Sequence, residues 1–191
     1  NSKFNSDWVS KVGIRDEMNF VKRPLLSCSK KQILSYAAKN SISYIFDLSN
    51  NNNKYLRNNI RNNILPNLKQ SKIDTLLHDG QKYKIKYQKL IEKVTENHEK
   101  YIQYSNSEYV RVDKNISNLT DLVEFKFYIK KIIYNVLGKS INMSQYHWTE
   151  MRSFVNNSKS GSNFDLNDEI SIINDRESFY VFNCCFLNDL R

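Results

Sequence analysis

Apolar side chains recur every three or four positions over long stretches of the chain, a spacing that predicts helices with one inward face. Ser29 followed three positions later by Gln32 has the sequence of a capping box, so a helix is expected to start there and to end near Asn40. Residues 41–46, SISYIF, are rich in β-branched and aromatic side chains and predict a strand. The first part of the chain should therefore alternate between helical and extended elements.

The segment 54–66 predicts a short helix with two different sides. Leu56, Ile60 and Ile64 recur at a spacing of four and form an apolar side that would face inward. The cations recur at spacings of three and four, about one residue out of phase with that stripe; they are Lys54, Arg57 and Arg61. The helix should end near Pro66, because a proline ring disfavours helical geometry in the residue before it.

The chain after residue 66 is predicted to be mainly helical. Residues 72–104 keep a roughly helical period and predict one long helix, or a pair of helices broken near Gly80. A second strong pattern covers residues 119–137, where Gly138 is a typical helix stop, and Ser144 caps a third helix.

These patterns divide the chain near residue 70. Residues 1–70 follow the order extended segment, helix, strand, loop and helix, which is typical of the edge of an α/β sheet domain. Residues 71–191 form a mainly helical domain, in which His147 and Trp148 are expected to pack in the core. Short strands are predicted near the end of this domain, at 164–166, 170–173 and 179–182.

The charge of the chain indicates an anionic partner. The net charge is +9 and the pI about 9.3, and residues 1–66 alone hold eleven Lys and Arg against four Asp and Glu. Nucleic acid is the commonest anionic partner of basic proteins. Two alternatives remain open: the lysines only keep the protein soluble, or an AT-rich genome has enriched the chain in Asn, Lys, Ile and Tyr.

The sequence contains no evident reaction centre. The four glycines are too far apart to form a phosphate-binding loop; they are Gly13, Gly80, Gly138 and Gly161. The three histidines have no carboxylate or cysteine at metal-ligand spacing; they are His78, His98 and His147. No serine or cysteine lies in a nucleophile motif. We therefore assign no catalytic residue and no metal ligand.

Cysteine use and hydropathy indicate a cytosol-like compartment. Cys28, Cys184 and Cys185 lack metal-ligand spacing and are interpreted as reduced thiols. No apolar stretch approaches the roughly eighteen residues needed to span a bilayer, and no signal peptide is evident.

Four short motifs follow one another between residues 23 and 66. They are Arg23-Pro24-Leu25-Leu26, Asp47-x-Ser49-Asn50, Arg57-Asn58-x-Ile60-Arg61 and Leu65-Pro66. In this order they resemble the tRNA(Ile)-lysidine synthase family, where the same motifs recur at the end of the N-terminal ATP-pyrophosphatase-type domain. The resemblance continues more faintly through the segments around His147 and Phe164.

This resemblance implies a fold for each part of the chain. Residues 1–70 would be the C-terminal part of the adenylating domain, the α/β edge of a Rossmann-like ATP-pyrophosphatase fold. Residues 71–191 would be a mainly helical linker or tRNA-contacting domain with a few short terminal strands.

The resemblance also implies a tRNA-modifying ligase. Enzymes of that family activate the wobble cytidine of isoleucine tRNA with ATP, and the ε-amine of free lysine then displaces AMP to leave lysidine. The implied cofactor is ATP with Mg²⁺, the co-substrate is L-lysine, and the partner is an isoleucine tRNA with a CAU anticodon. A cytoplasmic location, bacterial or organellar, is implied too, and a homodimer is the default assembly.

The family's ATP-binding loop, spelled SGGxDS, does not occur in this chain. We therefore expect the chain to be an incomplete part of the enzyme that is inactive alone. Two alternatives remain: a stand-alone basic RNA-binding module without catalysis, and a helical interaction protein whose charge is incidental.

Seven residues of these motifs are candidates for binding tRNA or substrate: Arg23, Asp47, Ser49, Asn50, Arg57, Asn58 and Arg61. Arg57 and Arg61 are expected to contact phosphates, because a guanidinium group presents two parallel donors to phosphate oxygens. A solvated basic helix face would show the same spacing.

The other five candidates each have a structural alternative. Asp47 either holds the amine of lysine or caps the following helix, a role that also suits Ser49 and Asn50. Asn58 either orients a ligand or ties down the preceding loop. Arg23 either faces the substrate cleft or forms an ion pair with Asp47.

Overall fold

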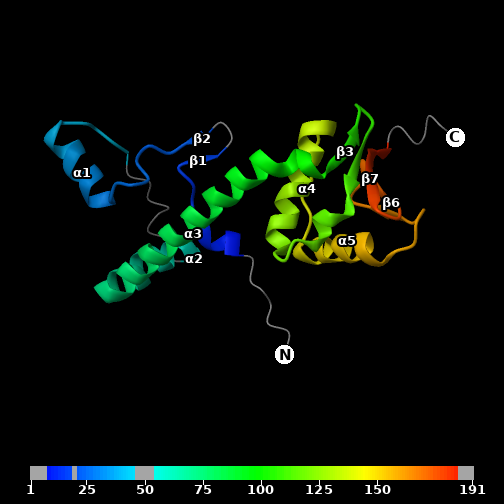
Figure 1. The fold of residues 1–191 in the computed structure, drawn as a ribbon. Helices are drawn as coiled ribbons and strands as arrows, with labels where there is room; N and C mark the ends of the chain where they lie inside the picture. Colours follow the sequence, from blue (N-terminus) through cyan, green and yellow to red (C-terminus); the bar gives the residue numbers. More distant parts are fainter. Residues whose placement is uncertain (1–7, 19–20, 46–53, 185–191) are drawn as a thin grey trace. The chain divides into compact units, whose positions relative to one another are not determined.

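The computed structural model describes residues 8–18, 21–45 and 54–184 (Figure 1). The chain divides into two compact units, residues 1–85 and residues 86–191. The domain boundary near residue 70 stays a prediction.

Unit 1 consists of short elements. They are η1 (Trp8–Val12), β1 (Glu17–Met18), β2 (Val21–Lys22), α1 (Lys30–Lys39), α2 (Leu56–Asn59), the π-helical turn η3 (Ile60–Ile64) and the 3₁₀ turn η4 (Leu65–Asn67). The capping box predicted for α1 is confirmed: the Ser29 hydroxyl accepts from the Gln32 N–H, and the Gln32 side chain accepts from the Ser29 N–H. Asn40 ends this helix as expected.

The helix predicted over 54–66 forms from Leu56 to Asn67, but in three kinds of helical turn. In the π-helical turn the Leu65 N–H donates to the Ile60 carbonyl, five residues earlier. The cause is Pro66, which lacks an N–H and whose ring would meet the carbonyl four residues before it in an α-helix. A wider turn before the proline relieves that clash.

Two expectations for unit 1 are wrong over the described residues. Residues 41–45 form a turn and irregular backbone and not a strand. A strand needs a partner strand, and no described segment of unit 1 pairs with this one. The apolar side of the 54–66 helix is also not turned inward, because Leu56 is 73% exposed and Ile64 is 45% exposed.

A single long helix, α3 (Gln70–Asn97), runs through residue 80 without a break. The structure thus decides between the two alternatives that the sequence left open, one helix or a broken pair. The predicted end of the helix near residue 104 is wrong, because the α-helix ends at Asn97 and residues 102–105 pair as a strand with residues 110–112. The division between the two units falls within this helix.

Unit 2 contains a five-stranded antiparallel sheet with strand order β3-β4-β7-β6-β5. Its elements are η5 (His98–Tyr101), β3 (Ile102–Ser105), β4 (Tyr109–Asp113), η6 (Lys114–Asn118), α4 (Leu122–Leu137), α5 (Gln145–Asn157), β5 (Asn163–Asp165), β6 (Ile170–Asn174) and β7 (Ser178–Asn183). The predicted caps of α4 and α5, Gly138 and Ser144, are confirmed, as are the three terminal strands. The strands β3 and β4 were not predicted.

The core of unit 2 lies between α4, α5 and one face of the sheet. Val110 and Val112 are fully buried on that face, and Phe125 from α4 meets Trp148 from α5 edge to face, with ring centroids 6.4 Å apart. Trp148 therefore packs in the core as predicted. The same expectation for His147 is wrong, because this residue lies on the exposed side of α5.

Two glycines in helices should respond oppositely to replacement by alanine. Gly138 ends α4 in the left-handed region at φ 64°, so Gly138→Ala is expected to lower the free energy of unfolding by about 1 kcal/mol. Gly80 lies inside α3 with open space around it, so Gly80→Ala is expected to raise helix stability by about 0.5–1 kcal/mol. Urea unfolding followed by far-UV circular dichroism compares the two; destabilisation by both would contradict the prediction.

Tyr128 makes the stability of unit 2 sensitive to alkaline pH. Burial raises the pKa of its phenol to about 12, with further contributions from Glu124 and Tyr101. A raised pKa in the fold means that stability is intact below pH 10 and is lost as the pH rises towards 12. In Tyr128→Phe this loss should be smaller, though not absent, because burial also raises the pKa of Tyr109. The exposed control Tyr146→Phe should retain the full loss. Urea midpoints measured at pH 9 and pH 11 test this, and equal losses in wild type and Tyr128→Phe would refute it.

Candidate functional site

Four of the seven candidate residues lie in the described part of unit 1. Arg23 follows β2, Arg57 and Asn58 lie in α2, and Arg61 lies in η3. The other three, Asp47, Ser49 and Asn50, lie outside the described residues.

Arg57 and Arg61 are both exposed and lie four residues apart on a continuous helical segment, which places them about one turn apart on the same side. Neither forms a salt bridge with another described residue. Two guanidinium groups arranged in this way can bind two neighbouring phosphates, or one phosphate from two directions.

Arg23 has a structural role in the β1–β2 hairpin. Its half-buried guanidinium donates to the Arg15 carbonyl at 3.2 Å, and its N–H donates to the Asp16 carbonyl at 2.8 Å. The alternative ion pair with Asp47 involves a residue outside the described part of the chain.

We call residues 54–66, which carry Lys54, Arg57 and Arg61, the cationic segment. Asn58 is buried within it, with 9% of its surface exposed. Its N–H donates to the Tyr55 carbonyl at 2.9 Å. Burial gives this side chain a fixed position next to Arg57, as either of its two predicted roles requires.

Some of the asparagines near the cationic segment stabilise its backbone. The Asn63 amide donates to the Asn59 side chain at 2.7 Å, and the Asn67 amide donates to the Asn63 carbonyl at 2.7 Å. Each bond joins residues four apart, so the pair of bonds supports the π-helical and 3₁₀ turns along one side. Sequence reasoning did not predict these bonds, although the spacing of four was visible.

The whole charge excess of the protein belongs to residues 1–85. They hold 15 Lys and Arg against 6 Asp and Glu, whereas residues 86–191 hold 14 of each. The arginines of the cationic segment therefore lie in the strongly basic unit, where the positive potential favours a polyanion.

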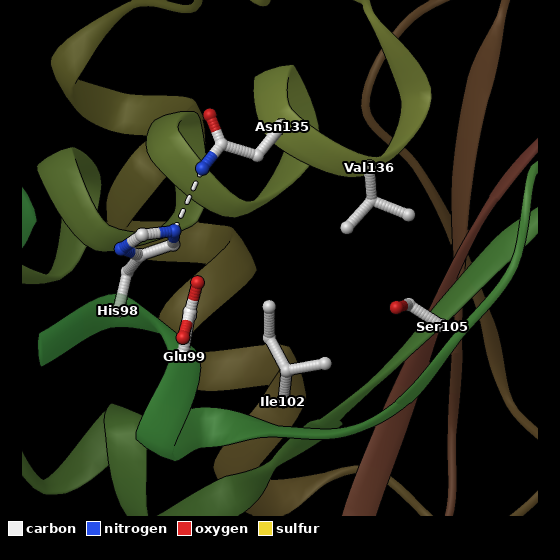
Figure 2. A pocket seen from close by; sticks show the side chains of 6 residues that line it. All are labelled: His98, Glu99, Ile102, Ser105, Asn135 and Val136. Carbon is white, nitrogen blue, oxygen red and sulfur yellow. Dashed lines mark hydrogen bonds between the residues drawn. The ribbon is translucent and has the colours of Figure 1, made fainter.

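A second feature is a pocket of about 360 Å³ in unit 2, lined by His98, Glu99, Ile102, Ser105, Asn135 and Val136 (Figure 2). His98 Nδ1 lies 3.0 Å from the Thr95 carbonyl, which can only accept, so Nδ1 carries the proton. His98 Nε2 then accepts from the Asn135 amide at 2.7 Å. Both ring nitrogens are occupied, so this histidine holds the pocket wall in place and is not poised as a base.

The pocket could not be found from the sequence, because His98 and Asn135 lie 37 positions apart in no common motif. Across the described residues, no three His, Cys, Asp or Glu side chains gather in a way that could hold a metal ion. Within the same residues, no helix is both long enough and apolar enough to cross a membrane.

Comparison with known proteins connects these features to a family. The model of the PP-loop domain matches residues 10–68, which include all seven candidate residues. A tRNA(Ile)-lysidine synthase of Francisella philomiragia is 32% identical over 161 residues, covering 80% of this chain and 37% of the relative. A tRNA(Ile)-lysidine synthase of Staphylococcus epidermidis is 29% identical over 151 residues, covering 78% of this chain and 35% of the relative.

A shorter match is closer in sequence. A tRNA(Ile)-lysidine synthase of Histophilus somni is 42% identical over 71 residues, or 36% of this chain. The Francisella and Staphylococcus relatives are much longer than this chain. The chain spans little more than a third of the length of each of them. The resemblance inferred from the motifs within residues 23–66 is confirmed by these matches.

Proposed function

We propose that this chain, which is related to the tRNA(Ile)-lysidine synthases, forms the tRNA-facing part of an enzyme that joins lysine to the wobble cytidine of isoleucine tRNA. The observation that carries the proposal is the pair of exposed arginines, Arg57 and Arg61, within the segment that the PP-loop model matches. Their guanidinium groups fit the phosphates of a tRNA backbone. The names of the relatives supply the reaction class, a ligation on tRNA.

The residues of this chain would bind and orient the substrates. Arg57 and Arg61 would hold the backbone beside the wobble nucleotide, and Asp47 would receive the ammonium group of lysine. Arg23, Ser49, Asn50 and Asn58 would shape the cleft around them. ATP with Mg²⁺ would supply the adenylyl group that activates the cytidine. No glycine-rich loop occurs in the 191 residues, so the phosphates of ATP are not assigned to this chain.

The burial pattern of unit 1 supports its interpretation as the edge of a larger Rossmann-like domain. Among its described residues the buried apolar side chains are Val12 and Ala37. Large apolar side chains are instead exposed, among them Ile45 at 97% and Leu56 at 73%. Many exposed large apolar side chains beside so few buried ones are expected where further protein packs. The domain boundary near residue 70 belongs to this proposal.

Isoleucine tRNA with a CAU anticodon, a cytoplasmic location and a two-fold dimer are the further parts of the proposal. The alternative function is an RNA-binding module without catalysis. The charge excess in unit 1 would suit either function, since phosphate binding needs no ATP site. The relatives that match most of the chain favour the ligase over this alternative.

A chimera separates the two functions. In the Francisella philomiragia relative, the region that this chain matches would be replaced by the present residues. Lysidine formation would then be measured by mass spectrometry of digested isoleucine tRNA. We expect the chimera to form lysidine, a chimera carrying Arg57→Ala and Arg61→Ala to lose most of this activity, and the present chain alone to form none.

The outcomes distinguish the two functions from each other and from unspecific binding. An inactive chimera that still folds and binds the tRNA would favour the RNA-binding module. Lysidine formation by the present chain alone would refute the view that it is an incomplete part. If the chain and the chimera each bind isoleucine tRNA and an unrelated tRNA equally well, the result would count against both hypotheses, the ligase and the RNA-binding module.

A further inference from the structure

The outer face of the unit 2 sheet carries a row of aromatic and cationic side chains. Directly paired residues on five strands form this row: Tyr104, Arg111, Tyr180, Ile173 and Asn163. Their neighbours along the strands, such as Val110 and Val112, point to the opposite face and are fully buried there. The row therefore lies on the side of the sheet away from the core.

The aromatic rings of this face contact one another. Tyr109 lies between the other two tyrosines, with ring centroids 5.4 Å from Tyr104 and 5.9 Å from Tyr180. Tyr104 is 52% exposed at the outer end of the row, and Tyr109 and Tyr180 are half-buried. The three linked tyrosines thus share one face of the sheet, and Tyr104 is the most exposed of them. Ser178 and Phe182 on the same face are buried. From here on, the tyrosine row means only four of the residues on this face: Tyr104, Tyr109, Tyr180 and Arg111.

Arg111 is held over this surface by its neighbours. Its Nε donates to the Ser178 hydroxyl at 2.9 Å, and its guanidinium carbon lies 5.6 Å from the centre of the Tyr180 ring. Asp175 lies 3.9 Å from the guanidinium. Hydrogen bonds from the Arg176 N–H and the Ser160 hydroxyl lower the pKa of Asp175, so the pair stays ionised at neutral pH. Arg111 is thus a planar cation held on this face by a hydrogen bond, a ring contact and an ion pair.

We propose that the tyrosine row binds an unpaired nucleotide of RNA, with its base stacked on Tyr104 and its phosphate or base edge beside Arg111. Aromatic side chains on the open face of an antiparallel sheet are a common way to hold unpaired bases, and arginine stacks in the same manner. The choice of RNA as the occupant rests on the proposed function and on the cation at the centre of the row. A folded tRNA offers unpaired bases in its loops and at its end.

Because unit 2 has no net charge, binding at this site should depend on salt differently from binding at unit 1. Since residues 86–191 have no net charge, stacking and not counterion release should supply most of the affinity. Binding at the tyrosine row should therefore depend weakly on salt, in contrast to binding at the arginines of unit 1.

The probe is a single-stranded RNA heptamer of adenosines, with a blunt RNA duplex as comparison, titrated into the whole chain carrying Arg57→Ala and Arg61→Ala. We expect Tyr104→Ala and Tyr180→Ala each to weaken heptamer binding about ten-fold, and Tyr104→Phe to preserve it. The controls for Tyr104 are Tyr134→Ala and Tyr146→Ala, which remove exposed tyrosines from α4 and α5 and should not change heptamer binding. The duplex should bind weakly to every variant.

A second readout keeps the test decisive if a variant folds poorly. Stacking shifts the base protons of the heptamer upfield in NMR spectra, and this shift should disappear in Tyr104→Leu while the circular dichroism stays unchanged. An unshifted spectrum with the wild-type row, or equal losses in the control variants, would overturn the inference. Sedimentation that shows a dimer lost in Tyr104→Ala would overturn it too, since a second copy of the chain would then occupy the face.

The experiment separates this inference from the proposed function. If isoleucine tRNA binding requires Arg57 and Arg61 but is indifferent to Tyr104, the proposed function stands and the tyrosine row fails. If the heptamer binds at Tyr104 while the chain shows no preference for isoleucine tRNA, the tyrosine row stands and the proposed function fails.

Discussion

Replacing Arg57 and Arg61 together by alanine is expected to weaken the binding of isoleucine tRNA by about 100-fold at low salt. Each exposed guanidinium should hold a phosphate by charge-assisted hydrogen bonds, and the loss of one such contact should lower affinity about ten-fold. The slope of log affinity against log salt concentration should fall by about two, because two fewer counterions are released. Fluorescence anisotropy with labelled tRNA at several salt concentrations measures both quantities.

A matched variant controls for the loss of charge. The double variant Lys31→Ala and Lys39→Ala also removes two positive charges, but from exposed positions on α1. If the effect depends on place, this variant should weaken binding only about two- to three-fold. The pair Arg57→Lys and Arg61→Lys keeps the charge and removes the forked donors, so an intermediate loss is expected. If replacing the two lysines by alanine weakens tRNA binding as much as replacing the two arginines, the arginines contribute only their positive charge and not a specific phosphate contact.

Trp148→Ala is expected to destabilise unit 2 by about 3–5 kcal/mol, enough to unfold a substantial fraction of the molecules. The indole is fully buried between α5 and α4, where it meets the Phe125 ring, and alanine would leave a cavity that the sheet cannot close. Urea unfolding followed by far-UV circular dichroism measures the change.

The same helix provides the control for Trp148. Tyr146 lies two residues earlier on α5 and is 67% exposed, so Tyr146→Ala should change the free energy of unfolding by less than about 0.5 kcal/mol. A Trp148→Ala variant with the stability of Tyr146→Ala would mean that α5 does not pack on the core in solution.

Short sequence motifs were sufficient to predict where three of the helices begin or end. The capping box at Ser29, the left-handed glycine at position 138 and the serine cap at position 144 act through atoms within four residues. Their geometry is therefore written in a short window of sequence. Pro66 acts in the same short range, but it widened the preceding turn and did not simply end the helix.

Strand pairing required contacts that no short window contains. Residues 41–46 have the composition of a strand, yet residues 41–45 remain irregular because no described strand lies beside them. The strand β4 has an ordinary alternation and forms because β7, almost seventy positions later, pairs with it; Arg111 meets Ser178 across that distance. Propensity favours a strand only where tertiary contacts supply its neighbour.

The candidate site was partly accessible from the sequence. The helical spacing of Arg57 and Arg61 was readable directly, and the described residues place both on an exposed helical segment, although what they bind stays a proposal. The hydrogen bonds of His98 were not accessible, because its two partners, Thr95 and Asn135, combine one local and one distant contact.

The sequence by itself determined the caps of three helices, which third of the chain is most basic and which family's motifs it carries. These properties depend on residue identity and on separations of a few positions. Only the tertiary structure decided which apolar residues are buried, which segments pair as strands and which tyrosines form one surface. Those outcomes depend on free energies of contact between distant segments, and such contacts exist only once the chain has closed the loops that separate them.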